Sequence, residues 1–332
     1  MDVFLQQLIN GLTLGCVYAV VALGYTMVYG IIQLINFAHG EVVMIGAMVA
    51  FSVIVALAGT GMPPLIIVLL GVLAAVPACM AVGYTVERVA YRPLRNAPRL
   101  APLITAIGVS IILQHLALLI WGRSYISFPQ LLPNATHALT SSPTSATITN
   151  VQIAIITLSI AMMVGLVMLV YRTRIGIAMR AVSQRPDVAG LMGISSNNVI
   201  SFTFVMGAAL GAIAGVMIGS YYGIAHYQMG FLLGLKAFCA AVLGGIGNLA
   251  GAVLGGILIG LIEAFGAGYM GDLTNVCFLN TFLPGFGALC EANNNMSVFG
   301  SSYKDVFAFI VLIMVLVFRP QGLLGERVSD RA

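Results

Sequence analysis

Residues 172–198 read RTRIGIAMRAVSQRPDVAGLMGISSNN, the longest polar and positively charged interruption in a largely apolar chain. Uncharged apolar runs flank it at 151–171 and 199–222, each long enough for the roughly 20 residues that a membrane-spanning helix needs. Within the interruption, Pro186 suits the first turn of a helix, and Gly193 suits the left-handed residue that ends one. The pattern predicts a short helix over 184–192 that lies at the membrane surface between two spans.

The composition excludes a soluble domain. The chain has 332 residues, of which 60% are hydrophobic and 7% charged, and its mean hydropathy is +1.06. Basic residues are spread between apolar runs instead of gathering with aromatics on one surface, so the net charge of +4 does not indicate nucleic acid as a partner. The start lacks the positive region of a cleavable signal peptide, so the first span is expected to stay in the mature protein. We expect an all-α polytopic membrane protein with one transmembrane domain over 1–332.

Apolar runs, free of charge except for Glu263, predict the spans. They cover about 8–29, two runs between Glu41 and Glu87 that residues 59–64 separate, 101–121, 151–171, 199–222, a short Gly-rich segment at 237–249, 250–269 and 306–318. The prediction is therefore about nine crossings, within a range of about eight to ten. The Gly-rich segment is the shortest of these runs.

Lys and Arg set the expected orientation, because cytoplasmic loops are enriched in them. One set of alternate loops holds most of the 14 basic residues: Arg88, Arg92, Arg95, Arg99, Arg172, Arg174, Arg180, Arg185, Arg319, Arg327 and Arg331. The other set holds Arg123, Lys236 and Lys304. This count predicts a cytoplasmic carboxyl terminus, a cytoplasmic loop at 172–198, a periplasmic amino terminus and a periplasmic loop at 271–302. It requires the segment at 237–249 to cross or deeply enter the bilayer, with Lys236 at its outer start.

Glycines recur every fourth residue in two spans. The positions are Gly207, Gly211, Gly215 and Gly219, then Gly247, Gly251 and Gly255, and also Gly256 and Gly260. Small residues at this spacing let helix backbones approach closely in lipid, which favours a packing role. A pore lining or a sliding surface is the alternative.

Few groups at membrane depth can ionise, and such groups are costly to keep there unless they have a function. The candidates for a translocation pathway are Asn36, His39, Glu41, Lys236 and Glu263. For Glu263 the alternative is a structural hydrogen bond to a neighbouring helix. The polar knot at 36–41 could lie inside the bundle, as broken helices do at transport sites. It could also be a tight cytoplasmic turn between the first two spans, which the loop count favours.

No enzyme motif emerges. The segment GGIGN at 244–248 lacks the Gly-Lys-Ser/Thr ending of a phosphate-binding loop, and the four histidines show no metal-ligand spacing. We therefore expect no catalytic residue, no metal and no cofactor on this chain. Cys277 and Cys290 fall in the polar outer stretch, where a disulfide is expected if that side is the periplasm; two independent thiols are the alternative.

Three blocks along the chain resemble one family. NFAHGE at 36–41, GGIGNLAG at 244–251 and FRPQGLLG at 318–325 are similar to the corresponding blocks of LivH-type permeases of bacterial branched-chain amino acid ABC importers. The resemblance implies a multi-pass permease of the inner membrane that imports leucine, isoleucine and valine. Implied partners are a LivM-type permease, two cytoplasmic ATPases that bind ATP and Mg, a periplasmic amino-acid-binding protein, and membrane lipid. Urea, amides or other amino acids remain alternative substrates, and a stand-alone secondary carrier remains an alternative mechanism.

The same resemblance gives the opening stretch a role. It resembles the coupling loop of ABC permeases, whose short helix docks on the ATPase. The implied coupling residues are Arg180, Ala181, Gln184, Arg185, Asp187, Ala189, Gly190, Met192 and Gly193. On charge alone, a basic loop that only fixes topology or touches anionic lipid would be favoured. The stretch 272–302 departs from the family pattern by its length, and we hypothesise that it touches the binding protein or the partner permease.

Overall fold

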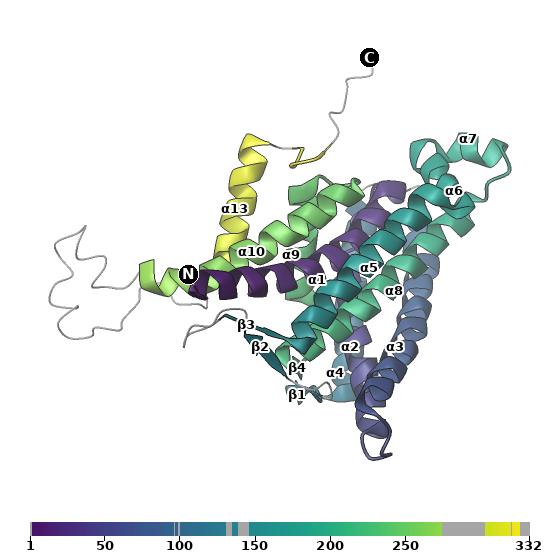
Figure 1. Cartoon of the computed structure of the whole chain (residues 1–332). Coiled ribbons are helices and arrows are strands. Elements are labelled where there is room, and N and C mark those ends of the chain that lie inside the picture. The colour runs from purple at the N-terminus through teal and green to yellow at the C-terminus, as the bar shows by residue number, and fades with distance from the viewer. Residues whose placement is uncertain are drawn as a thin grey trace.

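A computed structural model describes residues 2–95, 97–98, 100–130, 135–138, 146–273, 303–319 and 321–325 (Figure 1). The long helices are α1 (Asp2–Ile32), α2 (His39–Leu57), α3 (Pro64–Val86), α4 (Leu100–Trp121), α5 (Asn150–Arg172), α8 (Ser196–Tyr222) and α10 (Leu249–Leu273). Shorter helices are α6 (Arg174–Gln184), α7 (Pro186–Leu191), α9 (Met229–Gly244) and α13 (Lys304–Phe318). A π-helical turn, Glu87–Tyr91, and a 3₁₀ turn, Arg92–Leu94, continue α3.

Within these described residues, seven helices are long and apolar enough to cross a membrane. Each overlaps one of the apolar runs predicted as spans, so a mostly helical, multi-pass membrane protein is confirmed. The helix α9 has 16 residues and α13 has 15, both short of the roughly 20 that a perpendicular crossing needs. The expected total of about nine crossings stays a prediction.

The helices begin and end where local chemistry satisfies their backbone. Pro64 occupies the first turn of α3, where its missing N–H costs nothing. Thr149 and Gln152 form a reciprocal capping box at the start of α5. Gly223 ends α8 in the left-handed conformation at φ +67°.

Glycines bring the central helices together. Along α10, Gly256 lies against the backbone of Ala19, and Gly260 lies against Gly15, so α1 and α10 pack backbone to backbone. On α8, Gly215 lies against the backbone of α2 at Val43. These contacts confirm the packing role. Gly247 is an exception, because it has φ +97° and lies in the link between α9 and α10.

Four short strands lie at one end of the bundle and were not predicted. β1 (Ile126–Ser127) pairs antiparallel with β4 (Ile224–Ala225), and β2 (Thr136–Ala138) pairs antiparallel with β3 (Thr147–Thr149). Figure 1 shows α6 and α7 at the opposite end from β1 and β4. We term these the α7 end and the strand end.

The basic segments that the loop count assigned to one side share the α7 end. Arg92 and Arg95 contact the first two turns of α8. Met179 of α6 and Gly247 of the α9–α10 link line the same hollow. The segment 321–325 bonds to the last turn of α9, with Leu323 N donating to Leu243 O at 2.9 Å. The helix α9 therefore leads the chain from the strand end back to the α7 end.

Candidate functional site

The segment that interrupts the apolar sequence forms a hairpin of two helices, α6 and α7. Thr173 caps α6 by accepting a hydrogen bond from Gly176 N at 3.1 Å. Met179 and Val182 are buried and fix α6 to the bundle. The predicted short helix is confirmed as α7, with Pro186 in its first turn and Gly193 at φ +81° after it. The helix α6 was missed, although Thr173 and the apolar spacing of Ile175, Met179 and Val182 are a usable signal.

The outer face of the hairpin carries an apolar ridge. Leu191 is 87% exposed, Met192 is 79% exposed and Val188 is also exposed. Of the expected coupling residues, Arg180, Gln184, Arg185, Asp187, Gly190 and Gly193 are exposed as well. Ala189 is only 4% exposed. It packs inside the hairpin, at the base of the hollow described next, so its part in coupling stays a prediction.

A hollow of about 620 Å³ lies between α6 and α7. Its lining comprises Ala181, Gln184, Arg185, Val188, Ala189, Met192 and Ile194. Such a combination of an exposed apolar ridge, a hollow and flanking charges is suited to bind another protein. Val188, Leu191 and Ile194 lie within the predicted coupling loop at 172–198 but were not among its individually expected coupling residues.

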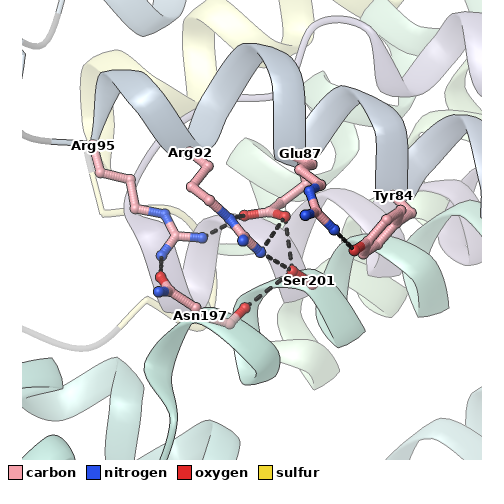
Figure 2. A network of polar contacts seen from close by, with 7 residues as sticks. Tyr84, Glu87, Arg92, Arg95, Asn197 and Ser201 are labelled. Carbon is pink, nitrogen blue, oxygen red and sulfur yellow. Dashed lines mark hydrogen bonds and ion pairs between the residues drawn. The ribbon is translucent and has the colours of Figure 1, made fainter.

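A buried ionic network joins the end of α3 to the start of α8 (Figure 2). Glu87 is fully buried and pairs with Arg92 at 3.2 Å and with Arg95. Ser201 Oγ donates to Glu87 Oε2 at 2.7 Å, and Arg92 Nη2 donates to Ser201 Oγ at 2.9 Å. A buried carboxylate needs such partners to offset its desolvation. The sequence analysis assigned these arginines a topological role only.

The structure brings Lys236 and Glu263 together. Lys236 Nζ lies 2.9 Å from Glu263 Oε1 and 2.7 Å from Asp305 Oδ1. Lys304 Nζ lies 3.2 Å from Glu263 Oε1, and Tyr18 Oη donates to Glu263 Oε2 at 2.8 Å. The four charges come from α9, α10 and α13 and balance one another. Lys236 is in the middle of α9, not at the outer start of a crossing as predicted.

Glu263 thus joins its own helix to three others. This is the structural role, a bond to neighbouring helices, that was the alternative to a place in the translocation pathway. The Glu263 side chain is 1% exposed. Lys304 and Asp305 were not among the candidates, although adjacent opposite charges at the start of the last apolar run are a signal for such a cluster.

The polar knot at 36–41 lies inside the bundle. His39 N bonds to Asn36 O at 3.0 Å, so a tight turn is present, but Asn36, His39 and Glu41 are all buried. The helix α2 begins at His39, whose imidazole lies beside Gly207 and Gly211 in the middle of α8. A tight turn between α1 and α2 is therefore present, and its polar groups lie inside the bundle where α2 begins, as the broken-helix alternative expected.

Neutral groups hold the knot in place. Glu41 Oε1 accepts from Gln114 Nε2 at 2.7 Å and from Ser110 Oγ at 3.1 Å. Asn36 Oδ1 accepts from Tyr91 Oη at 3.0 Å. These bonds connect the start of α2 to α4 and to the end of α3. The five candidates thus form two groups, one at the start of α2 and one around Lys236.

The cysteines fall into two groups, three in described helices and two outside the described residues. Cys277 and Cys290 lie outside the described residues, as does the stretch 274–302. Cys16, Cys79 and Cys239 are buried free thiols. Among the residues that the structure describes, no group of three or more His, Cys, Asp and Glu side chains could hold a metal ion.

Comparisons with known proteins agree with this arrangement. Residues 7–316 match the family described as "Branched-chain amino acid transport system / permease component". The chain is 47% identical to the high-affinity branched-chain amino acid transport system permease protein BraD of Pseudomonas aeruginosa, over 97% of this chain and 96% of that protein. It is 42% identical to the LivH permease of Salmonella typhimurium over the same shares.

A more distant relative is the probable branched-chain amino acid transport permease LivH of Methanocaldococcus jannaschii, 25% identical over 92% of this chain and 87% of that protein. No solved structure matches. The match over almost the whole chain, together with the seven apolar helices in its described part, shows that the chain belongs to the branched-chain amino acid transport system permease family.

Proposed function

We propose that this chain is one of two permease subunits of an ATP-driven importer of leucine, isoleucine and valine. The family match and two relatives at 42–47% identity support this assignment. The partners would be a LivM-type permease, two ATPases that hold ATP and Mg, and a periplasmic amino-acid-binding protein. This chain would hold no cofactor and would translocate substrate without being an enzyme.

The α7 end is proposed to face the cytoplasm and the strand end the periplasm of a bacterial inner membrane. The gathering of Arg-bearing segments at the α7 end supports this orientation, because cytoplasmic loops are enriched in Lys and Arg. With α9 and α13 completing about nine crossings, the amino terminus and the stretch 271–302 would be periplasmic.

The exposed ridge on α7 carries the proposal of ATPase coupling. ATP binding can change the relative stability of inward-open and outward-open states only through contacts that differ between them. Residues 172–198 would provide that contact, with Leu191 and Met192 docking in the ATPase and Arg185 and Asp187 at the rim. Ile194 N bonds to Ala189 O at 3.0 Å, and Ser196 Oγ bonds to Pro186 O at 3.2 Å. These bonds fix α7 to the start of α8, so a push on α7 would reach the bundle.

The polar groups at the start of α2 would line or adjoin the moving part of the pathway. Asn36, His39 and Glu41 lie where a helix begins inside the bundle, which is the arrangement of transport sites in other membrane carriers. Gly207 and Gly211 leave room for the His39 imidazole. A shift of α8 would therefore change the surroundings of His39 directly.

The test uses the complete importer in liposomes with its binding protein and ATP. Leu191→Asp and Met192→Asp should abolish leucine uptake and release the ATPases, because a charge in an apolar contact is costly to desolvate. The control is Thr60→Asp, which places the same charge at an exposed position of the strand end. Unchanged uptake and ATPase retention in the α7 variants would contradict the coupling role. Uptake by this chain alone, driven by a proton gradient, would support a secondary carrier instead.

A further inference from the structure

A hollow of about 300 Å³ near the strand end is lined by residues of α1, α8, β4 and α9. The burial of its lining residues shows which end of the hollow is closed and which end is open. Tyr18, Lys236 and Leu233 are buried, whereas Tyr125, Tyr222 and Ile224 are exposed. The hollow therefore has a closed inner part at Lys236 and opens where β1 pairs with β4. This is the end at which an importer receives its substrate if α7 binds the ATPases.

The lining combines aliphatic side chains with three tyrosines, His226, Gln228 and one ammonium group. Ile218, Met229 and Leu233 form aliphatic walls, and Lys236 and Tyr18 lie at the inner part. Small-molecule sites commonly combine such walls with one or two polar groups, and their volumes begin at about 300 Å³. The dimensions suit a single small molecule with an aliphatic group.

Lys236 can accept a carboxylate. An ammonium group has three N–H donors. One of them is donated to Glu263 Oε1 at 2.9 Å, whereas Asp305 Oδ1 forms an ion pair with the ammonium at 2.7 Å without hydrogen-bond geometry. Among the described residues, its remaining polar contact is a long one of 3.5 Å to Tyr18 Oη. Glu263 and Asp305 fix the position of the ammonium group, and the third donor remains for a ligand in the hollow.

We infer that this hollow is an entry site for an amino acid with an aliphatic side chain. The carboxylate of the ligand binds Lys236, and its side chain packs on Ile218, Met229 and Leu233. Its α-ammonium is then directed to the outer half, where the faces of Tyr125 and Tyr222 attract a cation. Urea and simple amides carry no carboxylate to pair with the remaining donor of Lys236, so the site favours amino acids. The inference rests on the proposed function and names the substrate class and the place where it is received.

The test again uses the full importer in liposomes. Met229→Trp fills the hollow without touching the ion cluster, and it should lower leucine uptake about tenfold, since small steric misfits in apolar pockets cost about that much. Alanine, which needs less room, should compete with leucine more effectively in this variant than in the wild type. Phe231→Trp is the matched control, because Phe231 is on the same helix but does not line the hollow. It should leave uptake unchanged.

Two further variants address the ammonium group. Lys236→Arg keeps the charge and should retain part of the uptake, whereas Lys236→Met should lose it. Size-exclusion profiles of the assembled complex identify any variant that fails to fold. If the Lys236 variants fail to fold, the uptake measured for Met229→Trp decides whether the entry site exists. If wild-type complex takes up no leucine, the proposed function fails. If wild type takes up leucine and Met229→Trp does so equally well with unchanged alanine competition, the entry site is wrong while the importer assignment stands.

Discussion

Ser201 Oγ donates a 2.7 Å hydrogen bond to Glu87 Oε2, and this bond joins the second turn of α8 to the turn that follows α3. Four residues, 192–195, separate the end of α7 from the start of α8. A movement of α7 must therefore move the end of α3 as well, or else break this contact. The network in Figure 2 thus connects the proposed docking helix to a second part of the bundle.

Removing the charge of Glu87 should weaken that connection. Glu87→Gln leaves Arg92 and Arg95 without their counter-charge, and breaking a fully buried pair costs about 3–5 kcal/mol. Both arginine side chains are partly exposed, so solvent screening should reduce the loss to about 2 kcal/mol. Thermal unfolding of the purified complex measures this, and Ser201→Ala should cost less because it removes only a neutral donor. Equal stability of Glu87→Gln and wild type would contradict a structural role for the network.

The cluster around Lys236 should behave as one unit. Glu263→Gln and Lys236→Met should each destabilise the chain, because each leaves an opposite charge unpaired in the bundle. The double variant should lose less than the sum of the two, with a coupling free energy of about 1–3 kcal/mol. Denaturation in detergent of the wild type, both single variants and the double variant provides the cycle. Strict additivity would show that the 2.9 Å contact between Lys236 and Glu263 contributes nothing.

The close approach of α8 to α2 should depend on Gly215. A Cβ there would come within 2.9 Å of Ala47 N and closer still to Val43 O. Gly215→Val should therefore force the helices apart and cost about 3 kcal/mol or more. Gly165→Val on α5 is the matched control, since nothing lies within 4 Å of a Cβ at that position. Similar yields and melting temperatures for the two variants would count against the packing role.

The sequence was informative where the signal is local. Apolar runs located the seven long helices, and Pro186 with Gly193 located α7, because hydropathy and the backbone limits of proline and glycine act within a few residues. The strands β1, β2 and β3 were missed because the segment 124–150 shows no clear alternation of apolar and polar residues, and β4 was missed because it has only two residues. The start of α9 was missed because the predicted segment was placed on the glycine-rich motif, at 237–249.

Long-range partners could not be read from the sequence. Tyr18, Lys236, Glu263 and Asp305 come from four helices and follow no common spacing, so only the packed structure brings them together. The burial of Ala189 has the same origin, because it depends on how α7 folds back on α6. Loop counting does predict which segments share an end, since it needs only the order of the crossings.

The tail after α13 should stabilise the end of α9 through its backbone geometry. Leu323 N and Leu324 N donate to Leu243 O and Gly244 O, each at 2.9 Å. Gly322 makes this possible because it has φ +78°, and a Cβ there would come within 2.6 Å of Gly245 N. Gly322→Ala should therefore cost the roughly 1–2 kcal/mol of a left-handed alanine and the strain of the contact in addition. Gly61→Ala isolates the first effect, because Gly61 has φ +70° with nothing within 4 Å. In thermal unfolding, the melting temperature of Gly322→Ala should be lower than that of Gly61→Ala, and both should be lower than that of the wild type. If Gly322→Ala were no worse than Gly61→Ala, the contact between the tail and α9 would carry no stability.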